Sequence, residues 1–349
     1  MKEKLMNLLK NRKTLIILCC VLALILILMV AGIAYMEGLL GLINRNPDNS
    51  TMSSSEYEDF LNSQGESKPD DFSGDEIDPD DVTWGEDEDI DKSKNILNIM
   101  LIGQDRRPGE GRSRSDVMIL CTINKSAKTL TITSFLRDMY VQIPGYQDDR
   151  MNVCYILGGM DLLESCMQKN FGVEIDGSFE VDFNGFMDVI DAIGGVDITL
   201  TRAEADYLNS TIWRDIGSTE YWKLREGENH LNGMQALAYS RIRAIDSDFG
   251  RTQRQRNVLT ELLEEVKTMS TREVNTLLKT LLPLLTTDLT NAEILDYAAD
   301  ILPLLGKLSV KTQRIPDDGT YRGAWIREMS VLVPDLEANR LLLKDAMKD

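Results

Sequence analysis

The chain has 349 residues and a formal net charge of −19 at pH 7, which argues against a general nucleic-acid-binding protein. Most of this charge is local. The segment from Asp48 to Asp91 holds 17 Asp and Glu against one Lys, a net charge of −16, which leaves −3 for the rest of the chain. The five cysteines form neither a CxxC pair nor a cluster with the single histidine, so we predict no zinc site. Among Cys121, Cys154 and Cys166 at most one disulfide can form, and free thiols are the favoured interpretation.

The N-terminus has the pattern of a membrane anchor. Residues 1–13 hold five Lys and Arg against one Glu, and residues 14–36 are apolar almost throughout. As a helix, the 22 residues from Thr14 to Tyr35 would be about 33 Å long, enough to cross the hydrocarbon core of a bilayer. A cleaved signal peptide is the alternative, but its apolar region is usually about 7–15 residues long. We therefore predict a transmembrane helix over 14–36, a basic cytoplasmic tail over 1–13, and an extracytoplasmic location for the rest of the chain.

Residues 37–94 are predicted to form a disordered acidic spacer. Most of the stretch is rich in Asp, Glu, Ser, Asn and Gly, and its few apolar residues, among them Tyr57, Phe60 and Trp84, follow no period. Such a composition buries too little apolar surface to offset the entropy that ordering costs. The spacer would separate the membrane from a folded domain.

The folded body is predicted to begin near residue 95 and to alternate strands with helices. Short apolar runs predict strands over 96–103, 117–123, 130–135, 179–183, 196–200 and 308–314. Helical spacing predicts helices over 152–171, 185–193, 231–240, 252–269, 271–285, 291–305 and 335–347. Residues 201–230 are polar and are expected to form loops. The pattern predicts an α/β fold with a central mixed β-sheet between helices, with a main domain over 95–270 and a helical extension over 271–349 packed on it.

An arginine-rich stretch, Tyr239–Gln255, is the strongest candidate for a functional site. Its charged members are Arg241, Arg243, Asp246, Asp248, Arg251 and Arg254. We expect the first arginine pair at the end of a strand or helix, a turn over 246–250, and the second pair on one face of a following helix. Guanidinium groups never lose their charge and bind phosphate oxygens two at a time, so the stretch suits a multiply charged phosphate. The alternative is a solvated face of Arg–Asp pairs.

Acidic residues flank the first predicted strands. Asp105 follows the strand over 96–103 and Asp116 precedes the strand over 117–123, so both carboxylates can reach one point at the sheet edge. Two carboxylates with phosphate oxygens form a usual site for Mg²⁺, whereas the alternative is that each caps a turn or pairs with a nearby arginine. Arg137 and Asp138 end the third strand, at an edge where α/β sheets bind ligands.

Two further polar residues have simpler interpretations. Asn152 opens the helix predicted over 152–171 and is most simply its N-cap, although its amide can also meet a ligand. His230 is interpreted as a surface or capping residue. Because it is the only histidine, a Ser-His-Asp hydrolase is not expected.

Seven segments in order resemble the LytR-CpsA-Psr family of cell-wall glycopolymer ligases. They are NIMLIGQD, RSDVMIL, FLRDMYVQIPGY, RMNVCYILGG, VDFNGFMDVIDAIGGVDI, LREGENHLNGMQALAYSRIR and DFGRTQRQ, which cover about residues 96–266. The apolar N-terminus and the helical C-terminal region also resemble members of the family. Two positions depart from it. Leu136 stands where the family often has a proline, and Arg256 stands where many members carry a second Gln.

The resemblance implies a catalytic domain over 95–270 and a phosphotransferase activity. The family transfers a glycopolymer from an undecaprenyl-pyrophosphate carrier to peptidoglycan, typically at the 6-hydroxyl of N-acetylmuramic acid. Carried over by motif, Asp105 and Asp116 would hold Mg²⁺, or alternatively Mn²⁺, at the pyrophosphate. The residues expected to bind the pyrophosphate are Arg114, Arg137, Asn152, Arg241, Arg243, Arg251, Arg254 and Gln255. Arg137, Arg241 and Arg243 would also act in catalysis, with Asp138 as the general base.

The implied partners are the polyprenyl-pyrophosphate-linked glycopolymer, peptidoglycan, the membrane through the N-terminal helix, and wall-synthesis proteins. The polyprenyl tail would enter an apolar tunnel between sheet and helices. The expected location is the cell membrane, with the catalytic domain facing the wall. Two alternatives stay open: a polyprenyl-pyrophosphate hydrolase with water as acceptor, and a non-catalytic lipid-phosphate-binding or regulatory wall protein.

Overall fold

The computed structural model describes residues 32, 34–45, 47–69, 72–85, 90, 92–104, 111–210 and 222–348. Within these residues no helix is both long and apolar enough to cross a bilayer. The basic tail over 1–13 and nearly all of the helix predicted over 14–36 lie outside the described residues, so both stay predictions.

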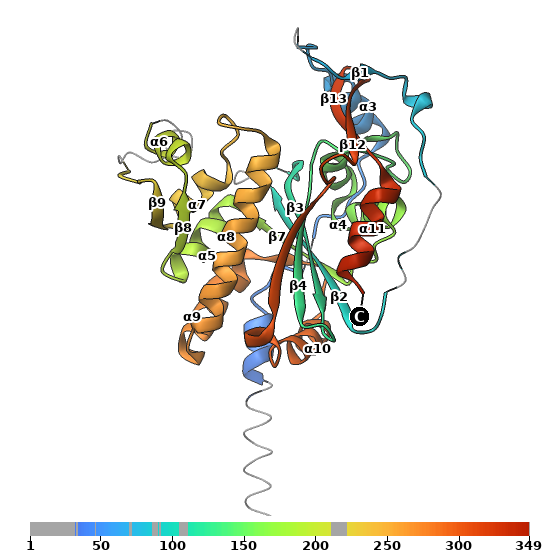
Figure 1. Ribbon diagram of the computed structural model, residues 1–349. Helices are drawn as coiled ribbons and strands as arrows, with labels where there is room; N and C mark the ends of the chain where they lie inside the picture. The colour runs from blue at the N-terminus through green and yellow to red at the C-terminus, as the bar shows by residue number, and fades with distance from the viewer. Residues whose placement is uncertain are drawn as a thin grey trace, which may run out of the picture.

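A mixed six-stranded sheet forms the centre of the molecule (Figure 1). Its strands lie in the order β10 (Thr286–Thr287), β7 (Gly177–Asp182), β2 (Ile96–Gln104), β3 (Ser115–Asn124), β4 (Thr129–Phe135) and β11 (Ser309–Ile315). β2, β3 and β4 are antiparallel neighbours, and β10 is antiparallel to β7. β7 pairs with β2, and β11 with β4, in parallel. The prediction of an α/β fold with a central mixed sheet between helices is confirmed.

Helices cover both faces of this sheet (Figure 1). On one face, α4 (Met151–Phe171) and α11 (Leu336–Ala346) pack on side chains of β2 and β3 that are at most 1% exposed, namely Met100, Ile102, Met118 and Leu120. On the other face, α8 (Asp248–Thr268) and α10 (Asn291–Ile301) pack on the alternate side chains of the same strands. This alternation is the two-residue period of a strand between two layers.

The two faces are not equally filled. On the α8 side, four side chains of the central strands remain partly exposed: Ile99, Leu101, Val117 and Cys121. Central strands between helix layers normally bury both faces. We call these four residues the apolar strip.

A smaller unit lies beside α8. It consists of α5 (Phe183–Ala192), β8 (Val196–Leu200), α6 (Arg202–Ser210), β9 (Gly227–Leu231) and α7 (Gly233–Ser240), with α9 (Thr271–Leu281) packed on α5. β8 and β9 form an antiparallel pair over an apolar core of their own. The prediction of loops over 201–230 is therefore wrong at α6 and β9, because Leu208 and Leu231 are fully buried in that core.

A second, three-stranded sheet lies at the top of the molecule in Figure 1. It pairs β1 (Asp75–Glu76) with β12 (Tyr321–Ile326), and β12 with β13 (Met329–Pro334). The short strands β5 (Tyr140–Val141) and β6 (Asp149–Arg150) form a separate pair. Three 3₁₀ turns complete the described elements: η1 (Pro79–Asp81), η3 (Leu282–Leu284) and η4 (Leu305–Lys307).

The prediction of a disordered spacer over 37–94 is wrong for the described residues, which pack on the body. α3 (Ser54–Ser63) starts with a capping box between Ser53 and Glu56. Tyr57 and Phe60 pack against the main core, and the ring of Trp84 stacks on that of Tyr140 at 5.8 Å between centroids. Apolar residues without a period can each occupy a separate site on a folded neighbour, and composition does not reveal such sites.

The prediction of a helical extension over 271–349 is also incomplete. This segment supplies β10 and β11 to the central sheet and β12 and β13 to the second sheet. β11 pairs with β4 along seven residues, from Ser309 opposite Thr129 to Ile315 opposite Phe135. Residue 270 is therefore not a domain boundary, because the central sheet is closed on one side by the C-terminal strand.

The described N-terminal residues lie at the lower end of the body in Figure 1. Leu39, Leu40 and Ile43 form an apolar cluster with Leu282, which follows α9. The chain therefore enters the body beside α9 and α10.

Candidate functional site

The arginine-rich stretch connects α7 to α8. Arg241 is the C-cap of α7, and α8 starts at Asp248 after the N-cap Ser247. The predicted order of helix end, turn and helix is confirmed, although α8 starts four residues before the predicted Thr252. An acidic residue in the first turn suits the positive end of a helix, so Asp248 is electrostatically favoured there.

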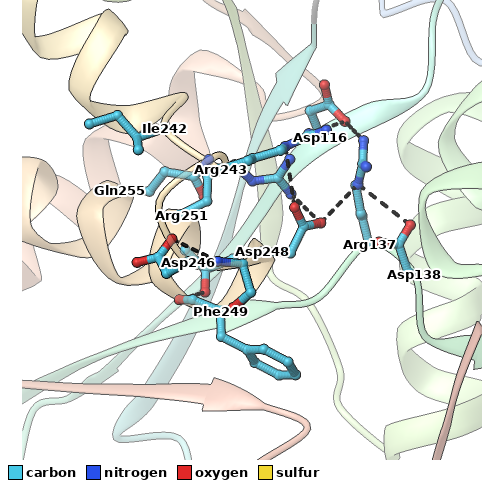
Figure 2. A network of polar contacts seen from close by, with 12 residues as sticks. Asp116, Arg137, Asp138, Ile242, Arg243, Asp246, Asp248, Phe249, Arg251 and Gln255 are labelled. Carbon is cyan, nitrogen blue, oxygen red and sulfur yellow. Dashed lines mark hydrogen bonds and ion pairs between the residues drawn. The ribbon is translucent and has the colours of Figure 1, made fainter. Parts of the chain in front are cut away.

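The guanidinium group of Arg137 lies among three carboxylates (Figure 2). Its Nη1 donates a hydrogen bond to Asp116 Oδ1 at 2.8 Å, and its Nε donates to Asp248 Oδ2 at 3.1 Å. The same Nε lies 3.4 Å from Asp138 Oδ1. The beginning of β3, the end of β4 and the beginning of α8 thus converge on one cation.

Arg243 adds a second cation to this group (Figure 2). Its Nε lies 3.2 Å from Asp248 Oδ1, and its Nη2 lies 3.8 Å from Asp116 Oδ1. Two carboxylates therefore each lie between two arginines. A guanidinium group binds phosphate oxygens with the same paired N–H donors that it uses for carboxylates.

Arg251 is the least satisfied charge near this group. It is 2% exposed, and its Nη2 lies 3.1 Å from Asp248 Oδ2. The orientation does not make a hydrogen bond, and within the described residues none of its three guanidinium nitrogens donates one. A buried donor without an acceptor is costly, so such a group is expected to have a ligand.

Arg254 does not join the group. Its Nε donates to Glu204 Oε1 at 2.7 Å, and its Nη2 donates to Asp246 Oδ2 at 2.6 Å. Its Nη1 donates to Ile242 O at 3.1 Å. Every nitrogen of this guanidinium is used inside the protein, so Arg254 has a structural role, and its predicted place in the pyrophosphate site is not supported by the geometry.

Two other predicted residues lie at the margin. The guanidinium of Arg241 stacks over the ring of Phe183 at 4.8 Å from its centroid. Gln255 lies beside Arg251 on α8, with its Nε2 3.5 Å from Ser240 O (Figure 2).

A cavity of about 360 Å³ opens next to Arg137. It is lined by Glu66, Ser113, Arg114, Asp116, Arg137, Asp138, Arg150 and Asn152. Five of the eleven predicted site residues are in this lining: Arg114, Asp116, Arg137, Asp138 and Asn152. Asn152 is not the N-cap of α4, since Arg150 holds that position. The Oδ1 of Asn152 is buried and has no hydrogen-bond partner in the described part of the chain.

Burial and neighbouring charges shift two pKa values in the group. Burial raises the pKa of the Asp138 carboxyl, and the Asp248 carboxylate raises it further against the opposing effect of Arg137. Burial alone would lower the pKa of Arg137, but Asp138, Asp116 and Asp248 outweigh burial and raise it. Arg137 therefore stays charged, while Asp138 is moved toward the pH range in which a general base works.

Asp116 offers carboxylate oxygens for a metal ion at the cavity. Mg²⁺ typically takes one or two carboxylates together with substrate phosphates and water. The Asp116 side chain is 30% exposed and lines the cavity, so its hard oxygen donors fit such an ion. Asp105, the second predicted ligand, lies outside the described residues. Among the residues that are described, no group of three or more His, Cys, Asp and Glu could hold a metal.

The other expectations concern His230 and the cysteines. His230 lies on β9 and contacts Asp197 and the Gly194 carbonyl, each at 2.7 Å, so it is a surface residue as predicted. Cys121, Cys154 and Cys166 are free thiols, which confirms the favoured interpretation.

Sequence reasoning missed three lining residues, Ser113, Arg150 and Glu66. Arg150 stands in the RMN segment next to Asn152, and its position at the start of a helix was the available signal. Glu66 had no local signal, because it belongs to the segment predicted to be disordered.

Comparison with known proteins gives a consistent result. The sequence model of the LytR_cpsA_psr family matches residues 51–344. The match begins before α3, in agreement with the packing of that segment on the body.

Among sequence relatives, the chain is 33% identical over 185 residues to the polyisoprenyl-teichoic acid–peptidoglycan teichoic acid transferase TagT of Bacillus subtilis (strain 168), covering 52% of this chain and 56% of that protein. It is 36% identical over 187 residues to the transferase TagU of Oceanobacillus iheyensis, covering 51% and 54%. The matched region thus spans about half the length of these curated relatives. A solved structure described as TagT bound to LIIa-WTA superposes with a TM-score of 0.60 at 26% identity, over 74% of this chain and 94% of that one.

Proposed function

This chain belongs to the LytR-CpsA-Psr family, and from that premise we propose that it transfers a glycopolymer phosphate from a polyprenyl-pyrophosphate carrier to a hydroxyl of peptidoglycan. TagT and TagU are named as transferases of teichoic acid from a polyisoprenyl carrier to peptidoglycan. The observation that carries the proposal for this chain is the Arg137–Arg243 pair with its shared carboxylates, at the edge of a cavity.

The charge pattern suits the bond that must break. In the proposed reaction, a peptidoglycan hydroxyl, typically the 6-hydroxyl of N-acetylmuramic acid, attacks the phosphorus next to the sugar. A new P–O bond forms as the bond to the polyprenyl phosphate breaks. Negative charge develops on the phosphate oxygens, and Arg137, Arg243 and Arg251 would stabilise it. Arg241 would support the same group from the end of α7.

Asp138 is the proposed acceptor of the proton. It lines the cavity, and burial raises the pKa of its carboxyl toward neutrality. The leaving polyprenyl phosphate carries its charge away without needing a proton, so one base is enough for the step.

Asp116 is the proposed ligand for a Mg²⁺ ion, with Asp105 as a second ligand. When bound, the ion would neutralise charge on the pyrophosphate oxygens. Mn²⁺ has similar donor preferences and is the alternative.

The apolar strip is the proposed contact for the polyprenyl tail. Ile99, Leu101 and Val117 lie on the central strands on the same side as α8, which carries Arg251. A tail along this strip would remove partly exposed apolar surface from water, at about 25 cal/mol for each Å² buried.

The position of the protein relative to the membrane is proposed from its sequence. Residues 14–36 would cross the membrane once with the N-terminus in the cytoplasm, and the body would face the wall. The chain enters the body beside α9 and α10, so that end would lie nearest the bilayer.

The test uses the full chain in detergent micelles with a polyprenyl-pyrophosphate-linked oligosaccharide, Mg²⁺ and peptidoglycan fragments. Mass spectrometry should detect a glycan that carries a sugar phosphate. Arg243→Ala and Asp116→Ala should each lower the rate by about 10²–10³. Arg202→Ala, an exposed arginine on α6 paired with Asp206, is the matched control and should leave the rate unchanged.

Other outcomes separate the alternatives. Free sugar phosphate without a modified glycan would indicate a hydrolase. Tight binding of the lipid without turnover would favour the non-catalytic interpretation.

A further inference from the structure

The cavity has a second cationic side that the proposed reaction centre does not explain. Arg114 and Arg150 line the same cavity as Arg137, and both contact residues of the acidic N-terminal segment. Glu66 Oε1 accepts a hydrogen bond from Arg150 Nη1 at 2.7 Å. Gln64 Oε1 accepts from Arg114 Nη2 at 2.7 Å. Two side chains within residues 64–66 therefore accept hydrogen bonds from two arginines of the cavity.

The rest of the segment keeps these two residues in place. The ring of Phe60, on α3, lies 5.5 Å from the guanidinium of Arg114. The backbone N–H of Glu66 donates to Glu328 O at 2.8 Å, next to β13. Arg112, two residues before Arg114, donates to Ser50 O at 2.7 Å. The segment is thus attached to the body at several points, and Glu66 lines the cavity.

Arg114 and Arg150 are close enough to disfavour each other's charge. Burial, and then the charges of Arg150 and Arg137, lower the pKa of the Arg114 guanidinium against the opposing charges of Asp149 and Glu66. Within the described residues, Arg150 Nε, a buried donor, has no hydrogen-bond partner. Glu66 therefore leaves part of the polar capacity of this side unused, and a larger anion with several oxygens can use more of it.

The Glu66 carboxylate has a further contact, a long hydrogen bond of 3.5 Å that its Oε2 accepts from Ser330 N. The Glu66 side chain is 44% exposed, whereas that of Arg150 is 9% exposed. It lies on an extended stretch after α3, not on a strand or helix. An ion pair with one exposed partner is weak, because water screens it and the side chain loses entropy when held. A pyrophosphate presents more charge to the same two arginines.

We propose that Glu66 is an internal anion that occupies the Arg114–Arg150 side of the cavity in the free protein and is displaced when a pyrophosphate group enters. The N-terminal segment then acts as an autoinhibitory strap that lowers the affinity of the site. This inference rests on the proposed function only in that the site binds a pyrophosphate.

The test is isothermal titration calorimetry of the full chain in detergent micelles with inorganic pyrophosphate. Glu66→Gln keeps the shape and a hydrogen-bond acceptor but removes the charge. It should lower the dissociation constant about two- to fivefold, since it removes a competing ion pair. Glu76→Gln removes the same charge from the same segment, where Glu76 pairs with exposed Lys68 away from the cavity, and should change the constant less than about twofold.

An unchanged or larger dissociation constant for Glu66→Gln would overturn the proposal, because Glu66 would then support the site and not compete for it. Absence of pyrophosphate binding in both proteins would overturn it as well, and the transfer assay could still succeed through the lipid-linked donor. Tighter pyrophosphate binding by Glu66→Gln without any glycan transfer would refute the proposed function alone.

Discussion

Replacement of Arg251 by methionine is expected to stabilise the protein while it weakens anion binding. Arg251 is 2% exposed and donates no hydrogen bond within the described residues. Each buried donor without a partner costs about 1–3 kcal/mol, and the nearby Asp248 carboxylate offsets part of that cost. Asp248 keeps Arg137 and Arg243 as partners in the variant, so no carboxylate is stranded. We expect a net stabilisation of about 1–3 kcal/mol.

Arg254 provides a matched control on the same face of the same helix. Arg254→Met removes a guanidinium of similar burial, 5% exposed, but every nitrogen of that group is paired. Its loss leaves the buried carboxylate of Glu204 without its cation. Breaking a buried pair on one side costs about 3–5 kcal/mol. Two Arg→Met changes three residues apart are therefore expected to shift stability in opposite directions.

Thermal unfolding and calorimetry measure both effects. At about 2 °C per kcal/mol, Arg251→Met should raise the melting temperature by about 2–6 °C and Arg254→Met should lower it by about 6–10 °C. Loss of a charge-assisted hydrogen bond should weaken pyrophosphate binding by Arg251→Met about 10- to 150-fold. A lower melting temperature for Arg251→Met would refute the reasoning, since its charge would then be satisfied inside the protein.

Three further outcomes are expected. A fragment that begins at Lys94 should melt below one that begins at Glu37, because it lacks the buried side chains of Val82 and Ile90; equal melting temperatures would mean that the segment before it does not pack on the body. Burial above all, together with the charge of Asp288, raises the pKa of Glu164 to about 8 from its ordinary value of 4.5. The native state therefore keeps a proton that the unfolded chain releases, so this stability is complete below about pH 4.5 and is lost as the pH rises through about 8. Glu164→Gln should flatten that decline, as unfolding free energies at pH 5 and pH 9 would reveal; an unchanged slope contradicts the raised pKa. Chelation of divalent cations with EDTA should slow glycan transfer by the unaltered chain and have little additional effect on Asp116→Asn, whereas full activity in EDTA would exclude the proposed Mg²⁺.

Much of the site was accessible from the sequence because its residues stand at the ends of regular elements. The apolar runs of β2, β3 and β4 mark where strands stop, and the polar residues that follow are placed at one sheet edge by the pairing of those strands. Arg137, Asp138 and Asp116 could be grouped on that basis alone.

The different roles of Arg251 and Arg254 on α8 could not be predicted from their positions in the sequence. Spacing puts Arg251 and Arg254 on one face of a helix, yet Arg254 meets Glu204 from α6 and Arg251 does not. The difference depends on a carboxylate fifty residues away in the chain, whose position is fixed by the small unit beside α8.

The sequence by itself determined the family resemblance, the order of strands and helices in the core, and the residues that carry charge to the sheet edge. These follow from local period and spacing. Only the tertiary structure decided that the acidic segment packs on the body, that β11 completes the central sheet, and which arginine is paired internally. Those features depend on contacts between residues far apart in the chain, and the free energy of such a contact is set by the burial and partners that the folded neighbours provide.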